Sequence, residues 1–206
     1  MDGFGLIRRR LIGAAGLAAL NPGIAAAAPA KSPKTRVAIQ TGEGVIVVEL
    51  EDKKAPLTSA NFLRYVDSQK YNGGMFYRAS RTVGMPTHGS IQAGPSTYAR
   101  HYPPVAHEPT SKTGLRHKAG TISLTRNEPG SATSDFFICA SELPYLDAHP
   151  GEPGDNQGFA AFGHVVSGME VVHKILGMHT SKTAVVPAMK GQMLDPPVPI
   201  VTMKRV

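Results

Sequence analysis

The side chains most often used in catalysis occur in this chain without the neighbours that they need. Ser134 has no Gly-x-Ser-x-Gly surroundings and no assignable base, so a nucleophilic serine is not favoured. The single cysteine, Cys139, follows the apolar run 136–138 and is interpreted as a buried, unreactive thiol. The eight histidines show no metal-ligand spacing, and His107 and His117 are interpreted as surface groups or partners of backbone groups. We therefore expect neither a metal ion nor a cofactor.

Alternation of apolar and polar residues predicts mainly β-structure around these positions. Residues 37–50 read as a β-hairpin with its turn at 42–44. Phe136 and Phe137 are adjacent, so on a strand one of them should face the core and the other the opposite side. Further strands are expected at residues 75–78, 90–92, 120–125, 136–139, 159–166 and 201–204.

Two helices are predicted, far apart in the sequence. The first begins at Pro56 and ends at residues 72–74, and the second begins at Ser167, where Glu170 would complete a capping box, and ends at Gly177. Short strands with two separated helices favour an antiparallel barrel or sandwich, and two helices could cover the open ends of a closed barrel. Three longer segments are interpreted as surface loops: residues 79–89, 147–157 and 179–198.

Composition fits one domain of ordinary size with an appendage. The 206 residues are 41% hydrophobic and 18% charged, and the 22 glycines and 17 prolines suit a loop-rich β fold rather than a low-complexity chain. The net charge is +7, and without the first thirty residues, which hold three arginines and one aspartate, it would be about +5. This modest charge gives little support for nucleic acid or membrane partners, and we expect neither in the mature chain.

The first thirty residues have the layout of a secretory signal. Arg8, Arg9 and Arg10 precede an apolar run at 11–20, and small residues follow up to Ala30. We therefore predict a cleavable signal peptide at 1–30, a domain at 31–206, and a periplasmic location. The adjacent arginines fit a twin-arginine signal and the general Sec pathway equally well, so both export routes remain open.

Seven motifs, taken in order, strongly resemble those of the cyclophilin-type peptidyl-prolyl cis-trans isomerases. The resemblance covers about residues 36–178, and the signal together with residues 114–117 makes the bacterial exported branch the most similar one. It implies a closed, eight-stranded antiparallel barrel capped by two helices, in agreement with the element pattern. The motifs lie at residues 55–62, 76–78, 91–94, 120–126, 131–138, 145–147 and 159–163.

The resemblance also implies roles for individual residues. Arg78 would be the catalytic arginine, and Gln92 would hold the substrate backbone. The remaining substrate-binding positions would line a proline pocket, its rim and the adjoining groove. Phe137, Leu146 and Phe159 would line the pocket, Tyr145 would lie at its rim, and Thr125 and Arg126 would lie along the groove for residues before the proline.

Three positions depart from the family pattern or have another reading. Segment 79–89 replaces a short turn that carries a phenylalanine and a methionine, so Val83 or Met85 is expected to fold back as the missing pocket wall. Asp135 stands where the family often has glutamine, and a solvated pair with Arg126 is an equally good reading of its charge. Tyr145 replaces a rim aromatic that is commonly tryptophan, which leaves cyclosporin sensitivity open.

The implied reaction needs no nucleophile or metal, because an X-Pro bond isomerises by rotation alone, over a barrier of about 18–20 kcal/mol. Twisting returns the lone pair to the proline nitrogen, and a guanidinium beside it can donate a hydrogen bond that the planar amide cannot accept. The expected partners are proline-containing peptides and unfolded exported proteins, bound by a monomer. Two alternatives remain: a proline-peptide chaperone or scaffold with weak or no turnover, and a hydrolase.

Overall fold

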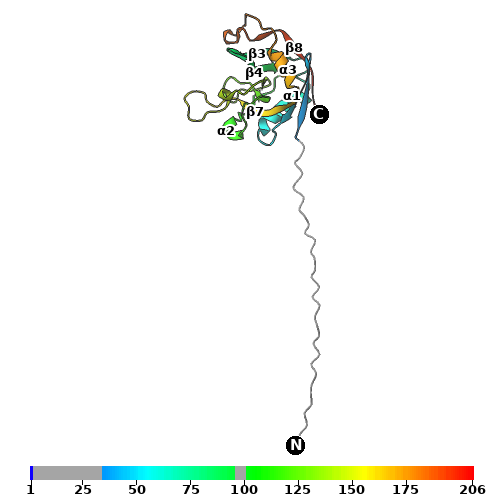
Figure 1. Ribbon diagram of the computed structural model, residues 1–206, viewed down its shortest axis with the longest axis vertical. Helices are drawn as coiled ribbons and strands as arrows, with labels where there is room; N and C mark the ends of the chain where they lie inside the picture. Colours follow the sequence, from blue (N-terminus) through cyan, green and yellow to red (C-terminus); the bar gives the residue numbers. More distant parts are fainter. Residues whose placement is uncertain (2–33, 96–100) are drawn as a thin grey trace. The chain divides into compact units, whose positions relative to one another are not determined.

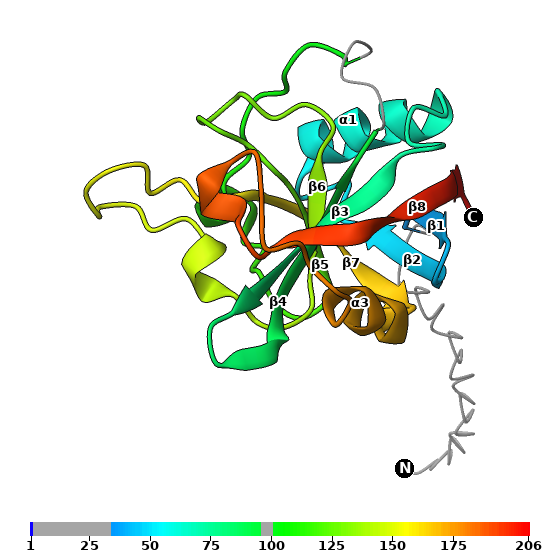
Figure 2. The same cartoon turned by 90° about the horizontal axis from the view of Figure 1, so that it is seen from above.

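The computed structural model describes residue 1, residues 34–95 and residues 101–206, and the predicted signal peptide, apart from residue 1, lies outside these ranges. Eight strands form a closed barrel in the order β1-β2-β7-β5-β6-β4-β3-β8 (Figures 1 and 2). Every strand pair is antiparallel, and the pairing of β1 with β8 closes the ring. The prediction of a mainly β, eight-stranded antiparallel barrel is confirmed. The strands are β1 Arg36–Thr41, β2 Gly44–Leu50, β3 Met75–Thr82, β4 Met85–Gly94, β5 Thr121–Leu124, β6 Phe136–Cys139, β7 Ala160–Ser167 and β8 Met193–Arg205.

The two predicted helices are α1 Pro56–Asp67 and α3 Met169–Leu176, and they lie on opposite sides of the strands in Figure 2. A third helix, the single turn α2 Thr110–Thr113, was not predicted. The capping box predicted for α3 is wrong. Ser167 is the last residue of β7, and Gly168 precedes the helix with a φ of +93° and no side-chain cap. A Cβ at Gly168 would lie 2.3 Å from the carbonyl oxygen of Val45, so glycine alone fits this sharp turn.

Strand β6 divides its side chains between two apolar clusters. Phe136 and Ile138 point into the main core, which fills the barrel, whereas Phe137 and Cys139 belong to a second cluster outside it. This is the expected consequence of the two-residue period of a strand. One four-residue strand therefore both stabilises the barrel and supplies the floor of a surface pocket.

Segment 79–89, predicted as a surface loop, instead extends the β3–β4 hairpin. Ala79 pairs with Ile91 and Arg81 with Gly89, so the ladder continues almost to the turn. The composition resembles that of a loop because residues 82–87, at the end of the hairpin, are exposed and need few apolar side chains. The predicted loop at 179–198 is shortened in the same way, because β8 already begins at Met193.

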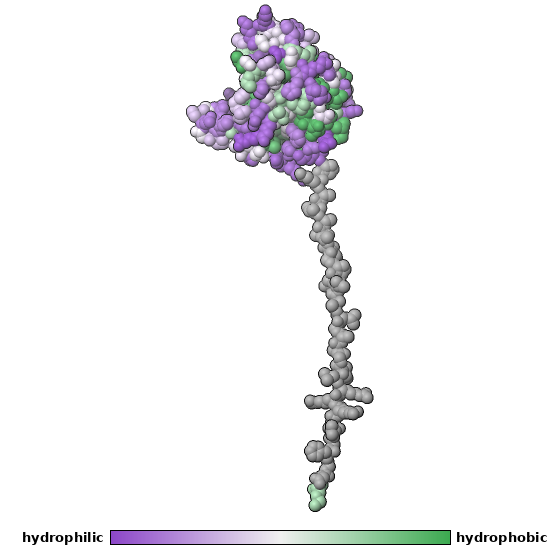
Figure 3. Space-filling view, in the orientation of Figure 1, coloured by the Kyte–Doolittle hydropathy of each residue, from purple (hydrophilic) through white to green (hydrophobic). Residues whose placement is uncertain are grey.

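Hydrophilic side chains cover most of the domain face shown in Figure 3, with an apolar area at its right-hand edge. Within the described ranges, no helix is long and apolar enough to span a membrane.

A carboxylate distant in sequence caps helix α1. The helix starts with Pro56 after Ala55, which offers no capping side chain. Glu108 is 7% exposed, and its carboxylate accepts two hydrogen bonds from Thr58, one from the backbone N–H at 2.8 Å and one from the side-chain hydroxyl at 2.7 Å. It also accepts one from the backbone N–H of Leu57 at 3.3 Å. A negative group here satisfies unpaired donors of the first turn and interacts favourably with the helix dipole.

Glu108→Ala should lower the free energy of unfolding by about 2–3 kcal/mol, because it leaves buried donors without their charged acceptor. Urea unfolding measures the difference. Glu128→Ala, at an exposed carboxylate, is the matched control and should change stability by less than about 0.5 kcal/mol. Equal stabilities of the two variants would contradict the capping role.

Candidate active site

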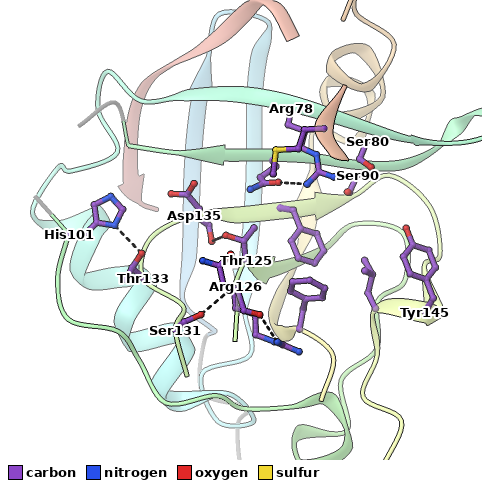
Figure 4. Close-up of a pocket in the computed structure, with 16 residues that line it drawn as sticks. Arg78, Ser80, Ser90, His101, Thr125, Arg126, Ser131, Thr133, Asp135 and Tyr145 are labelled. Atoms are coloured by element: carbon purple, nitrogen blue, oxygen red, sulfur yellow. Dashed lines mark hydrogen bonds between the residues drawn. The ribbon is translucent and has the colours of Figure 1, made fainter. Parts of the chain in front are cut away.

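One cavity of about 660 Å³ opens on the outer surface of the barrel beside β3, β4 and β6. Its lining includes all eight residues that the sequence resemblance singled out, and Figure 4 shows Tyr145 and His101 at opposite sides of it. The eight are Arg78, Gln92, Thr125, Arg126, Phe137, Tyr145, Leu146 and Phe159.

The apolar part of the cavity is built on the second cluster. The ring of Phe137, 4% exposed, meets the ring of Phe159 edge-on with centroids 5.4 Å apart, and Leu146 packs against the same cluster. Phe159 lies immediately before β7, and its backbone N–H donates to the carbonyl of Leu146 at 3.0 Å. This bond ties two walls of the cavity together. Tyr145 is 67% exposed and forms the rim.

A buried histidine supports Phe137 from behind. The rings of His117 and Phe137 are stacked, with centroids 5.7 Å apart. His117 Nδ1 lies 2.7 Å from Asp147 Oδ1, and Nε2 lies 3.0 Å from Ser123 Oγ. His117 is 1% exposed, so its reading as a surface group is wrong, although its backbone N–H does bond Asp147. Sequence spacing could not reveal this because the partner carboxylate is 30 residues away.

Asp147, His117 and Ser123 have the connectivity of a hydrolase triad, but the serine cannot meet a substrate. Ser123 is fully buried, pairs across the sheet with Phe137 and is not among the residues that line the cavity. An accessible nucleophile and an adjacent oxyanion site are what a hydrolase needs. Cys139 is also fully buried, and burial raises the pKa of its thiol to about 12. Neither group supports the hydrolase alternative.

Arg78 reaches the cavity because β3 contains a bulge. The register shifts between Phe76 and Arg78, so Phe76 and Ala79 are buried inside the barrel while Tyr77 and Arg78 both reach Gln92 on the outer surface. Regular alternation would have turned Arg78 inward. Burial lowers the pKa of its guanidinium, and a guanidinium still remains charged at neutral pH.

Two neutral amides hold that guanidinium. Gln92 Oε1 accepts from Nη1 of Arg78 at 2.9 Å, and Gln192 Oε1 accepts from Nε at 2.8 Å and from Nη2 at 2.6 Å. Among the described residues, three of the five N–H groups are thus paired, which leaves one hydrogen on each terminal nitrogen. The guanidinium of Arg78 is thus fixed in place, keeps its positive charge and retains two N–H groups that can donate to a ligand.

The amide of Gln92 is itself oriented by a phenol and a carboxylate. Its Nε2 donates to the hydroxyl of Tyr77 at 2.6 Å, and that hydroxyl donates to Asp135 Oδ2, also at 2.6 Å. Because the carboxylate can only accept, the phenol must present its oxygen to the amide N–H₂, and Gln92 Oε1 then faces Arg78. Asp135 thus accepts the hydrogen bond that orients Tyr77, and it does not pair with Arg126, whose ion pair is with Asp155.

Arg126 lines the cavity, but its guanidinium is engaged by the chain itself. It binds the carbonyl of Gly158 at 2.7 Å and Asp155 through both terminal nitrogens, and it lies 5.3 Å from the ring centroid of Phe159. Arg126 therefore fastens the loop 147–157 against the pocket wall. Thr125 is bound to the carbonyl of Asp135 through its backbone N–H and its hydroxyl.

The wall expected from Val83 or Met85 comes from elsewhere. Val83 is 98% exposed and Met85 46% exposed at the end of the β3–β4 hairpin, so that expectation is wrong. Met189 lines the cavity instead, and Gln192, three residues further on, contacts Arg78. Both follow α3, in a stretch whose sequence gave no signal of a site.

A family model described as cyclophilin type peptidyl-prolyl cis-trans isomerase/CLD matches residues 36–205. The chain belongs to this family. It is therefore an enzyme of the peptidyl-prolyl cis-trans isomerase class. Peptidyl-prolyl cis-trans isomerase A of Dickeya dadantii is 38% identical over 165 residues, 80% of each chain. Peptidyl-prolyl cis-trans isomerase B of Escherichia coli is 34% identical over 148 residues, which is 71% of this chain and 87% of that protein.

Solved structures agree with the fold of this cyclophilin-type chain. A cyclophilin-type isomerase from Cryptosporidium parvum superposes with a TM-score of 0.60 at 21% identity, covering 84% of this chain and 98% of that one. A second structure of that protein, determined in the presence of the dipeptide Ala-Pro, gives a TM-score of 0.57 at 22% identity and covers 82% and 96% of the two chains.

His117 should make stability depend on pH. Burial lowers its pKa in the folded state, and the bond to Asp147 only partly opposes this. The unfolded chain therefore binds a proton more readily, so the stability that the neutral ring contributes is present above about pH 6.5 and is lost as pH falls toward the folded pKa. Urea unfolding between pH 7.5 and 5 should show a steeper loss for the wild type than for His117→Gln. Parallel curves would contradict this assignment.

Proposed function

We propose that the cavity binds the proline of an X-Pro peptide and that Arg78 donates a hydrogen bond to the proline nitrogen as the peptide bond twists. The observation that carries the proposal is that Arg78, held by two amides, lines the same cavity as Phe137, Leu146 and Phe159. An apolar cup of this kind suits a pyrrolidine ring, and the related protein studied with Ala-Pro supports a proline peptide as ligand.

The rate gain comes from interactions that exist only in the twisted state. In the planar amide the nitrogen lone pair is delocalised and accepts no hydrogen bond, whereas at the barrier it is localised and can accept one from Arg78. The apolar wall adds to this effect, because the planar amide is more polar than the twisted one and loses more by leaving water. Each tenfold of rate requires about 1.4 kcal/mol, so one such bond together with desolvation supplies several powers of ten.

The other side chains would keep one part of the peptide still while the bond rotates. Phe137, Leu146 and Phe159 hold the ring, and Gln92, with its amide oriented by Tyr77, binds the flanking backbone. Tyr145 borders the ring site, and Thr125 lies along the groove for the residues before proline. Arg126 contributes to this groove chiefly by holding Phe159 and the neighbouring loop in position.

We propose that the natural substrates are unfolded exported proteins, and that a monomeric enzyme accelerates their X-Pro isomerisation outside the cytoplasm. The support is the arrangement of arginines, apolar run and small residues in the first thirty positions. Uncatalysed X-Pro isomerisation takes tens to hundreds of seconds, slow enough to limit the folding of a newly exported chain.

Arg78→Ala should lower kcat/KM for a proline tetrapeptide about a hundredfold or more, comparable to the loss of one preorganised donor at a transition state. Arg78→Lys should recover little of this, because a lysine cannot bind both amides and also reach the nitrogen. A protease-coupled assay with the purified full-length protein measures the rates.

Arg205→Ala is the matched control, because it removes an exposed arginine that is paired with Asp67 on the surface, and its activity should equal that of the wild type. Wild-type turnover by Arg78→Ala would refute the proposed mechanism. Peptide binding without catalysed exchange by the wild type would favour a chaperone or scaffold instead.

Expressed in a bacterium with its first thirty residues, the protein should accumulate in the periplasmic fraction and be shorter by about thirty residues, because the small residues before Lys31 suit signal peptidase. Intact mass and cell fractionation test this. Full-length protein confined to the cytosol would contradict export.

A further inference from the structure

The chain between α3 and β8, residues 178–192, runs alongside the extended β3–β4 hairpin and ends at the cavity. We call it the α3–β8 segment. Met189, in the short 3₁₀ turn Pro187–Met189, lines the cavity. Gln192 makes two of the three hydrogen bonds that Arg78 forms with side chains. A segment that resembles a surface loop in sequence thus reaches the group on which the proposed chemistry depends.

The side chain of Gln192 can present only its oxygen to Arg78. Its Nε2 donates to the carbonyl of Ala188 at 3.3 Å, which fixes the amide so that Oε1 faces the guanidinium. The backbone is fixed as well, because the N–H of Gln192 donates to the carbonyl of Met189 at 3.0 Å and its carbonyl accepts from the N–H of Ala79 at 2.8 Å. The acceptor is therefore built in place before any substrate arrives.

One oxygen that bonds both Nε and Nη2 fixes the plane of the guanidinium, not just its position. The contact with Gln92 restrains Nη1 alone and leaves the group free to tilt about that contact. Because Gln192 is neutral, it adds this restraint without cancelling the positive charge, as a carboxylate would. The remaining hydrogens on Nη1 and Nη2 then have defined directions.

The extended hairpin anchors the α3–β8 segment through Arg81. Its guanidinium donates to the carbonyl of Leu176 at 2.7 Å, to the carbonyl of Met178 and to the hydroxyl of Thr180 at 3.4 Å. Thr180 also forms a β-bridge with Leu194. The extended β3–β4 hairpin and the α3–β8 segment are therefore held together as one structural unit.

We propose that Gln192 is a positioning residue for Arg78, delivered to the site by the α3–β8 segment and required for full turnover. This inference rests on the proposed role of Arg78. It predicts that loss of the Gln192 acceptor slows the rotation step, because a tilted guanidinium donates poorly to the proline nitrogen, while binding of the planar peptide is largely kept.

The test is steady-state isomerisation by the full-length protein carrying Gln192→Met, which keeps the side-chain length and removes the acceptor. We expect kcat to fall about tenfold and KM to stay within about twofold of the wild-type value. Lys182→Met, at an exposed position of the same segment, is the control and should behave as the wild type. Gln192→Asn, whose amide is one methylene too short to reach Arg78, should behave like Gln192→Met. It replaces Gln192→Met in the test if the methionine variant does not fold.

A second readout separates positioning from a general loss of structure. In an Arg78→Lys background, Gln192→Met should have no further effect on kcat, because the guanidinium on which it acts is absent. The ¹⁵Nε–H signal of Arg78, assigned by its loss in Arg78→Lys, should shift and show greater fast motion in Gln192→Met.

Three results would overturn the inference: wild-type kcat in Gln192→Met, an equal loss of kcat in the Arg78→Lys background, or an unchanged Arg78 signal. If Arg78→Lys itself turned over like the wild type, the proposed role of Arg78 would fail instead. The two failures are therefore distinguishable.

Discussion

The site depends on holding a permanent positive charge beside an apolar pocket. A half-buried guanidinium loses hydration, and its hydrogen bonds must be replaced by groups that leave its charge available. Here the replacements are the neutral amide oxygens of Gln92 and Gln192. The nearby carboxylate of Asp135 is bound by the hydroxyls of Tyr77 and Ser134. A carboxylate on Arg78 would hold it as firmly, but would compete with the twisted amide for its donors.

The barrel meets this requirement with local departures from regular strand geometry. The bulge in β3 brings Tyr77 and Arg78 to the same outer surface, and the alternation of β6 puts Phe136 in the core and Phe137 in the pocket floor. The floor in turn rests on His117, whose two ring nitrogens both have partners. Pocket and core share strands, so the rigidity of the barrel is passed directly to the site.

Sequence reasoning succeeded where the signal is contained in a short stretch of chain. Strand alternation separated Phe136 from Phe137, and the ordered motifs named eight residues that do line one cavity. It failed where a function is divided between distant segments. Glu108 caps a helix 50 residues before it, and Gln192 contacts an arginine 114 residues away. Neither carries a local pattern, because its partner is defined only by the closed barrel. The closed barrel could therefore be predicted from the ordered motifs, whereas the short helix α2 and the support around Arg78 could not.

The most direct test of the account compares ground-state binding with rotation on the enzyme, in one NMR titration of a proline peptide with the wild type and with Arg78→Ala. If Arg78 acts on the twisted amide, the dissociation constant should change by less than about threefold while the cis-trans exchange rate of the bound peptide falls by about a hundredfold or more. A bound exchange rate that is unchanged, with all of the lost activity traced to weaker binding, would contradict it.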